Sequence, residues 1–355
     1  MKIAFLSYYS GSLNRGVETF VHELANRLAN LGHDVTVYQN GPGIDQSKYK
    51  TISLKINSDS RSGSYIPFFN YYARKVCEFT QKALKQMDRN TQIVFPTNGQ
   101  WQPLLCKLWT IRHKKKLVIA GQSGPGMDDK INLLTFPDMF VGLTEFQEKW
   151  AKRFNPFVRT AIIPNGVDLN KFNDSVKPYN FNLQKPIILC VSAFVFWKRL
   201  DLVIKAVSKM KNASLVLVGA SVKNDKTESE LRIMAQELLP ERHKILSFPY
   251  REMPAVYRGA DLFTYATVPW ESFGIVQVEA MASGLPVVAT NDSIRREIIG
   301  NAGLLVDPRK TDDYTQTLKK ALEIKWGDIP RKQAEKFSWD MISKRYEEIF
   351  EKISR

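Results

Sequence analysis

The sequence has 355 residues, enough for two domains of ordinary size, and its 44% hydrophobic and 25% charged residues exclude a disordered or fibrous chain. No apolar run reaches the roughly 20 residues that span a bilayer, and Cys77, Cys106 and Cys190 lack the spacing of a disulfide framework or a zinc site. We therefore expect a cytoplasmic protein, and its formal net charge of +15 favours anionic partners.

The first half of the chain alternates strand and helix patterns. Residues 3–6 are an apolar run typical of a buried strand, and a loop rich in Gly, Ser and Asn follows at 10–16. Apolar positions at helical spacing predict a helix over 17–31 that ends at Gly32, before a strand at 34–38. Further strands are predicted at 93–95, 117–120, 139–143 and 160–163. This order predicts a parallel, doubly wound sheet.

A stretch rich in Pro, Asn and Asp at 164–186 interrupts the pattern and is interpreted as a linker. The strands predicted after it lie at 187–192, 215–219, 244–248, 262–266, 286–290 and 303–306. The last segment begins at Ser338, a good N-cap, and has the spacing of an amphipathic helix. We therefore predict an α/β protein with Rossmann-like domains at 1–168 and 169–337, and a C-terminal helix at 338–355 that crosses back to the first domain.

Residues 48–116 form a strongly basic segment, with 14 Lys or Arg against the three acids Asp59, Glu78 and Asp88. Aromatic residues are interleaved with these charges: Tyr65, Phe68, Phe69, Tyr71, Tyr72, Phe79, Trp101 and Trp109. A basic, aromatic-rich face suits anionic lipid headgroups or nucleic acid. A solvated basic face above ordinary core aromatics explains the same composition.

Two carboxylates, Glu271 and Glu279, lie eight residues apart in the second half. The sequence after Gly274 predicts a helix that ends at 283–284, so Glu271 lies on the loop before the helix and Glu279 lies within it. The free amides of 273–276 then form an anion site at a helix N-terminus. Such a pair suits a sugar nucleotide, with one acid for the sugar hydroxyls and one for the ribose hydroxyls. The alternative is a capped helix with two surface acids.

The segment 271–279 resembles the signature of two glutamates, seven residues between them, of the retaining glycosyltransferases of the GT-B fold, in particular family 4 (glycosyl transferases group 1). Other segments resemble that family in the same order along the chain: 16–18, 32–37, 163–168, 191–206, 262–266, 279–290 and 303–308. The resemblance covers nearly the whole chain. It implies an α/β protein of GT-B architecture, in which two Rossmann-like domains face each other across a cleft, the first for the acceptor and the second for the nucleotide sugar.

The resemblance also implies roles for single residues. Glu271 would hydrogen-bond the hydroxyls of the donor sugar, Glu279 would bind the ribose, and Lys198 would neutralise the departing diphosphate. Backbone amides toward the sugar and the diphosphate would come from Phe273, Gly274, Ile275 and Val276. Because the departing group is anionic, a well-placed cation can replace a metal ion. No metal and no other cofactor are therefore expected, and there is no Asp-x-Asp motif.

Further residues are assigned to the donor site with alternatives open. Arg199 either shares the charge with Lys198 or is a plain surface residue. Arg15 stands beside Gly16, where the family usually has a glycine pair, and reaches the phosphates, the acceptor or only solvent. Asn165 belongs to the family's linker motif, and Tyr250 lies in the segment that we expect to contact the nucleotide base.

Two other positions depart from the family pattern. Ala193 stands where the family often has an arginine, and Gln122 stands where many members have a histidine near the reacting carbon. Gln122 follows a predicted strand in a Gly-rich loop, so it either orients the acceptor or the donor sugar or is satisfied by backbone groups. As an amide it cannot act as a base. We place it with Glu271 and Lys198 among the candidate catalytic residues.

We therefore predict a retaining, metal-independent glycosyltransferase that moves a hexose-type sugar from a nucleoside-diphosphate sugar to a glycan or lipid-linked acceptor, in polysaccharide or cell-envelope glycan synthesis. The alternatives are a sugar-nucleotide isomerase (an epimerase) of the same fold and a non-catalytic sugar-nucleotide-binding module. Because family members often act on lipid-linked acceptors, we expect peripheral contact with an anionic membrane at its inner face through residues 48–116. An anionic polysaccharide acceptor would explain the same charge, and no nucleic-acid partner is expected.

Overall fold

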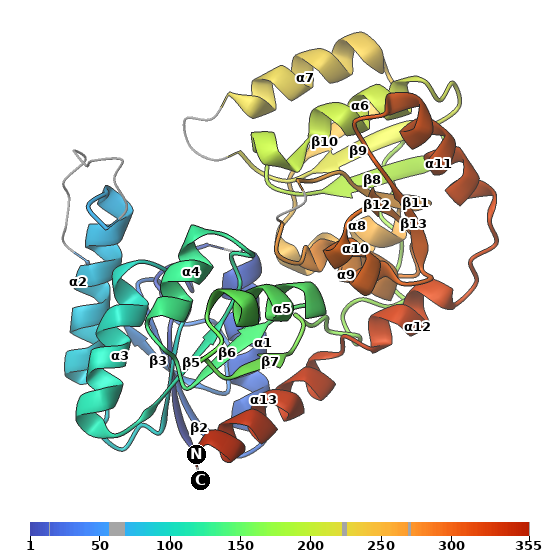
Figure 1. Ribbon diagram of the computed structural model, residues 1–355. Coiled ribbons are helices and arrows are strands. Elements are labelled where there is room, and N and C mark those ends of the chain that lie inside the picture. The colour runs from blue at the N-terminus through green and yellow to red at the C-terminus, as the bar shows by residue number, and fades with distance from the viewer. Residues whose placement is uncertain (14, 57–67, 222–225, 269–270, 355) are drawn as a thin grey trace. The chain divides into compact units, whose positions relative to one another are not determined.

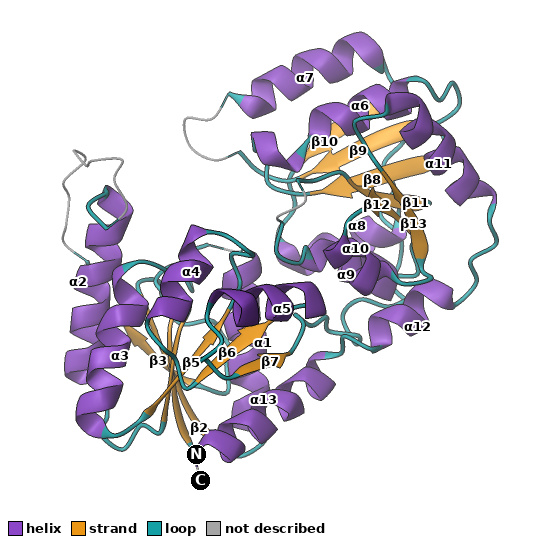
Figure 2. Ribbon diagram, viewed as in Figure 1, coloured by secondary structure: helices purple, strands orange, loops and turns teal. Residues whose placement is uncertain are grey.

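The computed structural model describes residues 1–13, 15–56, 68–221, 226–268 and 271–354. They form two compact units, one made of Met1–Asn165 with Trp339–Arg355 and the other of Gly166–Ser338. Each unit is a parallel sheet covered by helices (Figure 1), and colouring by secondary structure separates the strands from the helices around them (Figure 2). The predicted α/β fold class is confirmed, and the predicted first boundary, after residue 168, lies three residues beyond Asn165.

The first unit is built on a seven-stranded sheet in the order β3-β2-β1-β4-β5-β6-β7, with every neighbouring pair parallel. Its strands are β1 (Lys2–Leu6), β2 (Asp34–Gln39), β3 (Lys50–Ser53), β4 (Ile93–Pro96), β5 (Lys116–Ala120), β6 (Met139–Gly142) and β7 (Thr160–Ile162). Central strands such as β4 are buried along their whole length, which explains their continuous apolar runs.

In the described part of the first unit, six helices cover the two faces of this sheet. They are α1 (Gly16–Asn30), α2 (Tyr71–Gln86), α3 (Trp101–His113), α4 (Met127–Leu134), α5 (Glu145–Phe154) and α13 (Trp339–Ser354). One apolar core joins α1 and α13 to the sheet, and a second core joins α2, α3, α4 and α5 to it. The last helix of the chain therefore completes the unit that the first residues begin.

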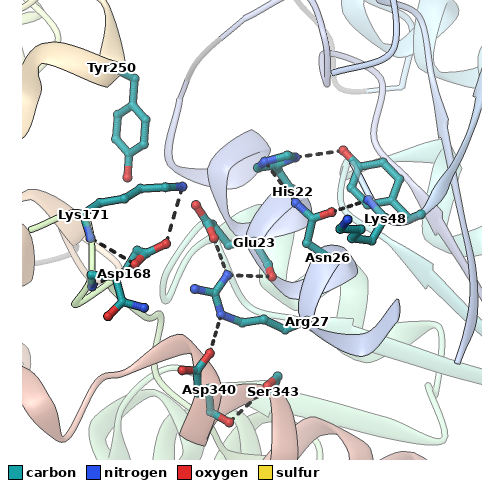
Figure 3. A network of polar contacts seen from close by, with 12 residues as sticks. His22, Glu23, Asn26, Arg27, Lys48, Asp168, Lys171, Tyr250, Asp340 and Ser343 are labelled. Carbon is teal, nitrogen blue, oxygen red and sulfur yellow. Dashed lines mark hydrogen bonds and ion pairs between the residues drawn. The ribbon is translucent and has the colours of Figure 1, made fainter. Parts of the chain in front are cut away.

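Polar contacts also hold α13 against α1. The guanidinium of Arg27 on α1 lies between the carboxylates of Glu23 on the same helix and Asp340 on α13, with 3.0 Å between Arg27 Nε and Asp340 Oδ1 (Figure 3). His33, which follows α1, lies 2.8 Å from Glu347 of α13 through its Nε2. The C-terminal helix is thus tied to the first unit by charge as well as by its apolar face.

The second unit has a six-stranded parallel sheet in the order β10-β9-β8-β11-β12-β13. Its strands are β8 (Ile187–Val191), β9 (Ser214–Val218), β10 (His243–Leu246), β11 (Leu262–Tyr265), β12 (Val287–Thr290) and β13 (Gly303–Val306). Its helices are α6 (Leu200–Ser208), α7 (Thr227–Leu238), α8 (Met253–Arg258), α9 (Ile275–Ala282), α10 (Ser293–Ile299), α11 (Thr311–Glu323) and α12 (Ile329–Glu335), with short 3₁₀ turns η1 (Phe196–Lys198) and η2 (Tyr250–Glu252).

The two segments that join the units run side by side at the edge of the second unit. The amide of Val167 donates to the carbonyl of Phe337 at 2.8 Å, and Val167 forms a parallel bridge with Ser338. Arg331 of α12 donates to the carbonyls of Leu169 and Ala282 at 3.0 and 2.7 Å. The chain thus enters and leaves the second unit at one place.

Candidate functional site

The second unit has its switch point between β8 and β11. These strands are neighbours at the centre of the sheet. From β8 the chain adds β9 and β10 on one side, and from β11 it adds β12 and β13 on the other side. Ligands of such sheets bind at the carboxyl ends of the strands beside the switch point. Lys198 lies in η1 after β8, and Glu271 lies in the segment after β11, so two residues far apart in sequence start from adjacent strand ends.

Lys198 and Glu271 form an ion pair there. Lys198 Nζ donates to Glu271 Oε2 at 2.7 Å and to the hydroxyl of Tyr265 at 2.9 Å. The side chains of Lys198 and Glu271 are only 14% and 18% exposed, so solvent screens the pair weakly. Two predicted catalytic residues are thus in direct contact, and a third residue, which the sequence did not indicate, contacts Lys198.

The surroundings of Lys198 keep its amine charged. Burial alone would lower the pKa of Lys198, but the Tyr265 hydroxyl accepts a hydrogen bond from the ammonium, and the Glu271 carboxylate adds both a hydrogen bond and its charge, so the net pKa is raised. Burial and the charge of Glu271 raise the pKa of the Tyr265 hydroxyl to about 12, although Lys198 opposes this shift. Lys198 is therefore a cation, and Tyr265 a neutral phenol, at neutral pH.

Gly274 makes the turn that starts α9. Its φ is +80°, and a Cβ at this position would approach Tyr265 Cε1 at 3.0 Å and Gln277 Nε2 at 2.6 Å. A side chain would therefore meet both strain and crowding. Phe273 before it is buried against Phe337. The backbone amides of Phe273, Gly274, Ile275 and Val276 lie at this helix start, where amides lack intrahelical partners.

Glu279 lies inside α9 and is held by two tyrosines. It is 4% exposed, and its Oε1 accepts from the hydroxyl of Tyr250 at 3.0 Å while its Oε2 accepts from Tyr257 at 2.8 Å. Burial, together with the charge of Glu279, raises the pKa of Tyr257 well above its ordinary value. Two predicted donor-binding residues, Glu279 and Tyr250, are thus in contact.

Tyr250 also lines a cavity on the second unit. The cavity has a volume of about 450 Å³, and its lining includes Phe172, Pro254 and the ring of Tyr250. Lys171 is also part of the lining, and its Nζ lies 3.5 Å from Asp168 Oδ2 (Figure 3). A lining that combines apolar side chains with the cations Lys171 and Arg251 is a suitable environment for an aromatic base with nearby phosphates.

Arg199 follows Lys198 in the left-handed conformation, with φ of +47°. Its guanidinium contacts the Asp201 carboxylate, with 3.2 Å between Nε and Oδ1. Lys198 and Arg199 therefore direct their charges to different carboxylates, and in this structure Arg199 does not contact Glu271 or Tyr265.

In the first unit, Gln122 and Asn165 pair through their side-chain amides. Gln122 Nε2 donates to Asn165 Oδ1 at 3.0 Å, and Asn165 Nδ2 donates back to Gln122 Oε1 at 2.9 Å. Gln122 follows β5 and Asn165 follows β7, both at the carboxyl edge of the sheet. The Gln122 side chain is thus satisfied by another predicted site residue and not by backbone groups, and its role toward the sugar stays a prediction.

Arg15 and Gly16 begin α1 at the same carboxyl edge. Arg15 is the residue before the helix, and Gly16 is its first residue. The Arg15 guanidinium lies 4.5 Å from the centre of the Tyr9 ring and 2.7 Å from Glu18. The Arg15 charge is thus paired with Glu18 while its side chain is 55% exposed, and its assignment to the phosphates, the acceptor or solvent stays a prediction.

Among the described residues of the second-unit site, the sequence analysis missed Tyr265, Tyr257 and Arg295, the last of which donates to the main-chain carbonyl of Glu271. Tyr265 is the last residue of β11, so its place at a strand end beside the switch point was a usable signal. Arg295 follows Asp292, the N-cap of α10, by three residues, a spacing at which side chains meet. Tyr257 carries no comparable signal, since it lies in an ordinary apolar helix.

The basic segment divides into surface and core. Phe79 is fully buried in the core behind α2 and does not reach the surface, which corrects its inclusion in an aromatic face. Phe69 is 58% exposed. Tyr65, Asp59 and the rest of 57–67 lie outside the described residues. Apart from those gaps, the exposed apolar residues of the segment lie largely on α3, at Leu104, Leu108 and Ile111.

The described part of the chain contains no group of three or more His, Cys, Asp or Glu side chains arranged to hold a metal ion. Nor does any helix within it have the length and apolar character to cross a membrane.

Three similar proteins illustrate the relationships of the chain. It is 27% identical over 216 residues to the D-inositol 3-phosphate glycosyltransferase of Corynebacterium jeikeium, which covers 54% of this chain and 51% of that protein. It is 28% identical to the phosphatidyl-myo-inositol mannosyltransferase of Mycolicibacterium smegmatis over 100% of this chain and 94% of that protein. The crystal structure of Anabaena HepE in complex with UDP-glucose superposes with a TM-score of 0.79 at 18% identity, covering 99% of this chain and 100% of HepE.

Family models match both halves of the chain. Residues 14–171 match Glycosyltransferase Family 4, and residues 171–338 match Glycosyl transferases group 1. The likeness to HepE shows the same GT-B fold. Since the two matches follow each other along two parallel sheets of this fold, the chain belongs to the GT-B glycosyltransferases of family 4.

Proposed function

We propose that this glycosyltransferase moves a hexose-type sugar from a nucleoside-diphosphate sugar to a glycan or lipid-linked acceptor, with retained anomeric configuration and without a metal ion, in polysaccharide or cell-envelope glycan synthesis. The observation that carries the proposal is the 2.7 Å ion pair of Lys198 and Glu271 at the switch point of the second unit. A sugar diphosphate presents negative charge and hydroxyl groups, and this pair offers a cation and a hydrogen-bond acceptor.

The donor is assigned to the second unit. In this proposal the diphosphate binds between Lys198 and the first amides of α9, where the helix dipole also favours an anion. Glu279 binds the ribose hydroxyls, because Tyr250 and Tyr257 fix its carboxylate in one orientation. The base lies toward the cavity beside Tyr250. The complex of HepE with UDP-glucose supports a nucleotide-sugar donor for this fold.

The chemical step breaks the bond between the sugar C1 and the phosphate oxygen and forms a bond from C1 to the acceptor oxygen. Retention follows when the acceptor attacks from the face that the diphosphate leaves, and the acceptor proton passes to a phosphate oxygen. Lys198 stabilises the charge that grows on that phosphate. Because Glu271 is ion-paired with Lys198, we assign it to orient the sugar hydroxyls and not to attack C1.

The acceptor is assigned to the first unit. The paired amides of Gln122 and Asn165 present hydrogen-bond donors and acceptors at the carboxyl edge of the first sheet. A neutral amide pair can orient a hydroxyl group but cannot remove its proton, which agrees with proton transfer to the leaving phosphate. Arg15 at the start of α1 adds a cation at this edge.

A lipid-linked acceptor would bring the enzyme to a membrane, and the name of the mannosyltransferase relative, which acts on phosphatidyl-myo-inositol, supports such an acceptor. On α3 the side chains of Leu104, Leu108 and Ile111 are 38%, 57% and 63% exposed. Their spacing of four and three residues places them on one helix face, which we call the α3 ridge. Exposed cations follow it at Arg112 and Lys114. We propose that the α3 ridge contacts the anionic inner face of the membrane reversibly.

The test is an assay with purified protein and a panel of nucleoside-diphosphate sugars, with and without candidate lipid-linked acceptors. We expect acceptor-dependent release of the nucleoside diphosphate with at least one donor, a product with the donor's anomeric configuration by NMR, and a loss of about 100-fold or more in Lys198→Ala. A product of inverted configuration would reject the proposed mechanism. Acceptor-independent conversion of the donor to an epimer would reject the transferase assignment itself.

A further inference from the structure

We infer that Tyr265 is a positioning residue of the transfer reaction: its hydroxyl holds the Lys198 ammonium toward the leaving diphosphate, and its ring sets the place of Lys198 relative to the Gly274 turn. The inference rests on the proposed function, in which Lys198 meets the diphosphate. It adds a residue that neither the sequence pattern nor the assigned roles of Glu271 and Lys198 include.

Two hydrogen bonds hold the Lys198 ammonium. An ammonium has three N–H donors. Glu271 Oε2 accepts one at 2.7 Å and the Tyr265 hydroxyl accepts another at 2.9 Å. A lysine side chain is flexible, and one contact fixes only one direction of its ammonium. With two contacts fixed, the third N–H has a defined direction, which we assign to the leaving phosphate.

The ring of Tyr265 lies beside the turn at Gly274. A Cβ built on Gly274 would lie 3.0 and 3.2 Å from Tyr265 Cε1 and Cζ, so the ring packs directly under the turn that begins α9. The Lys198 ammonium lies 5.4 Å from the centre of the same ring. One rigid side chain thus contacts both the cation and the helix start that are proposed to bind the diphosphate.

Tyr265 is itself held rigidly, as a residue that positions Lys198 must be. It is 2% exposed and closes β11, which pairs with β8 and β12 on either side. A phenol has two rotatable side-chain bonds, and both are constrained by packing here. Its hydroxyl therefore has a fixed position, in contrast to the long chain of Lys198 that it supports.

The experiment compares four proteins: the wild type, Tyr265→Phe, Lys198→Ala and the double variant. Tyr265→Phe removes one oxygen and keeps the ring that packs under Gly274. Because charge on the leaving group grows between the bound donor and the transition state, we expect kcat to fall about 10-fold while KM for the donor stays within about two-fold. In the Lys198→Ala background, Tyr265→Phe should have no further effect, since its action passes through Lys198.

Tyr314→Phe is the matched control. Tyr314 is also fully buried, and its hydroxyl lies 2.6 Å from Thr264 Oγ1, one residue before Tyr265. The substitution Tyr314→Phe removes an equivalent buried hydroxyl without touching Lys198, so it should lower the free energy of unfolding and leave kcat unchanged. Thermal unfolding of each variant separates stability from catalysis.

The remaining outcomes have distinct meanings. Additive losses in the double variant, an increase of KM alone in Tyr265→Phe, or equal kcat losses in Tyr265→Phe and Tyr314→Phe would each overturn the inference and leave the proposed function intact. An unchanged kcat in Lys198→Ala would instead overturn the proposed role of Lys198, and the inference with it.

Discussion

The guanidinium of Arg295, which has no exposed surface, donates through Nη1 to the main-chain carbonyl of Glu271 at 2.8 Å. Its other nitrogens contact Asp292, with 2.7 Å between Nη2 and Oδ2 and 2.8 Å between Nε and Oδ2. Asp292 in turn caps α10 by accepting from the Arg295 amide at 2.9 Å. The carbonyl of Glu271 is thus anchored to the start of α10, while its side chain reaches Lys198.

From this anchor we predict that Arg295→Leu weakens both the fold and the enzyme. Removing one partner of a buried ion pair typically costs about 3–5 kcal/mol, and the segment that carries Glu271 loses its attachment. Urea unfolding should show the loss in free energy, and kcat should fall with it. Arg296→Ala is the control, because Arg296 lies on the same helix but is exposed and bonds Asn291 at 2.8 Å. Equal effects of the two substitutions would contradict the assigned anchor.

The two glutamates should differ when each is changed to glutamine. Glu271→Gln loses the charge that pairs with Lys198 and is proposed to contact the sugar, so kcat should fall about 100-fold. Glu279→Gln keeps the shape of a residue held by Tyr250 and Tyr257, so it should mainly raise KM for the donor, about 10-fold. Initial rates over a range of donor concentrations separate these parameters. If both variants changed KM alone, the assigned division between sugar and ribose would be wrong.

Local patterns in the sequence are enough to locate Lys198, Glu271 and Gly274 at strand ends and at a helix start. They do not reveal the contacts of Tyr265 with Lys198 and of Arg295 with Glu271, because these join positions 67 and 24 residues apart and form only when β8, β11 and α10 are assembled. A buried arginine also contradicts the ordinary expectation that arginine lies at the surface.

The same limit applies to the fold. Central strands of both sheets, such as β1 and β8, were predicted within a few residues, because strands buried on both faces are apolar throughout. The edge strand β3 was missed because it has only four residues, none of them buried. Helices α2, α3, α4 and α5 were not predicted individually. In α3, Pro103 lies in the first helical turn, where its missing N–H costs nothing.

Metal independence gives a direct prediction. Because Lys198 is proposed to supply the charge that a metal would supply, dialysis against EDTA should leave the rate within about two-fold, and added Mg²⁺ or Mn²⁺ should not raise it further. The same treatment of a known metal-dependent glycosyltransferase serves as the control. A rate that vanished with EDTA and returned with one metal would show that the site needs a cation beyond Lys198.

The stability of the first unit should depend on pH through Asp129. This residue is fully buried, and its two carboxylate oxygens accept from Gln147 Nε2 at 2.8 Å and Asn132 Nδ2 at 3.1 Å. Burial raises the pKa of Asp129 from its ordinary 3.8 to about 7, although the two amides oppose the shift. Between these values the folded state binds more protons than the unfolded state, so this contribution to stability falls as the pH rises from about 4 to about 7.

Asp129→Asn removes this titration. Relative to the wild type, the variant should therefore gain stability progressively from pH 5 to pH 8, as measured by urea unfolding at each pH. Asp128→Asn is the comparison: Asp128 is less deeply buried than Asp129, but burial raises its pKa as well, so this variant should gain stability in the same direction and by less. A constant difference between Asp129→Asn and the wild type over this range would mean that Asp129 ionises at its ordinary pKa.

The last prediction concerns the α3 ridge and the membrane. Ile111 at the end of the ridge is 63% exposed, and Ile233 on α7 of the second unit is 62% exposed. If the ridge enters the interfacial region of the bilayer, Ile111→Ser loses part of the transfer free energy of its side chain, about 1 kcal/mol, which is roughly five-fold in partitioning. Ile233→Ser makes the same chemical change at equal exposure and should have no effect.

Sedimentation with anionic and neutral liposomes at low and high salt measures the vesicle binding of both variants. We expect binding to anionic vesicles that weakens with salt, because each Lys or Arg near the surface contributes up to about 1 kcal/mol of screened attraction. Equal losses in the two variants would reject the α3 ridge as the contact. Wild-type protein that stayed in the supernatant with anionic vesicles at low salt would reject membrane attachment altogether, and the basic segment would then be assigned to an anionic acceptor.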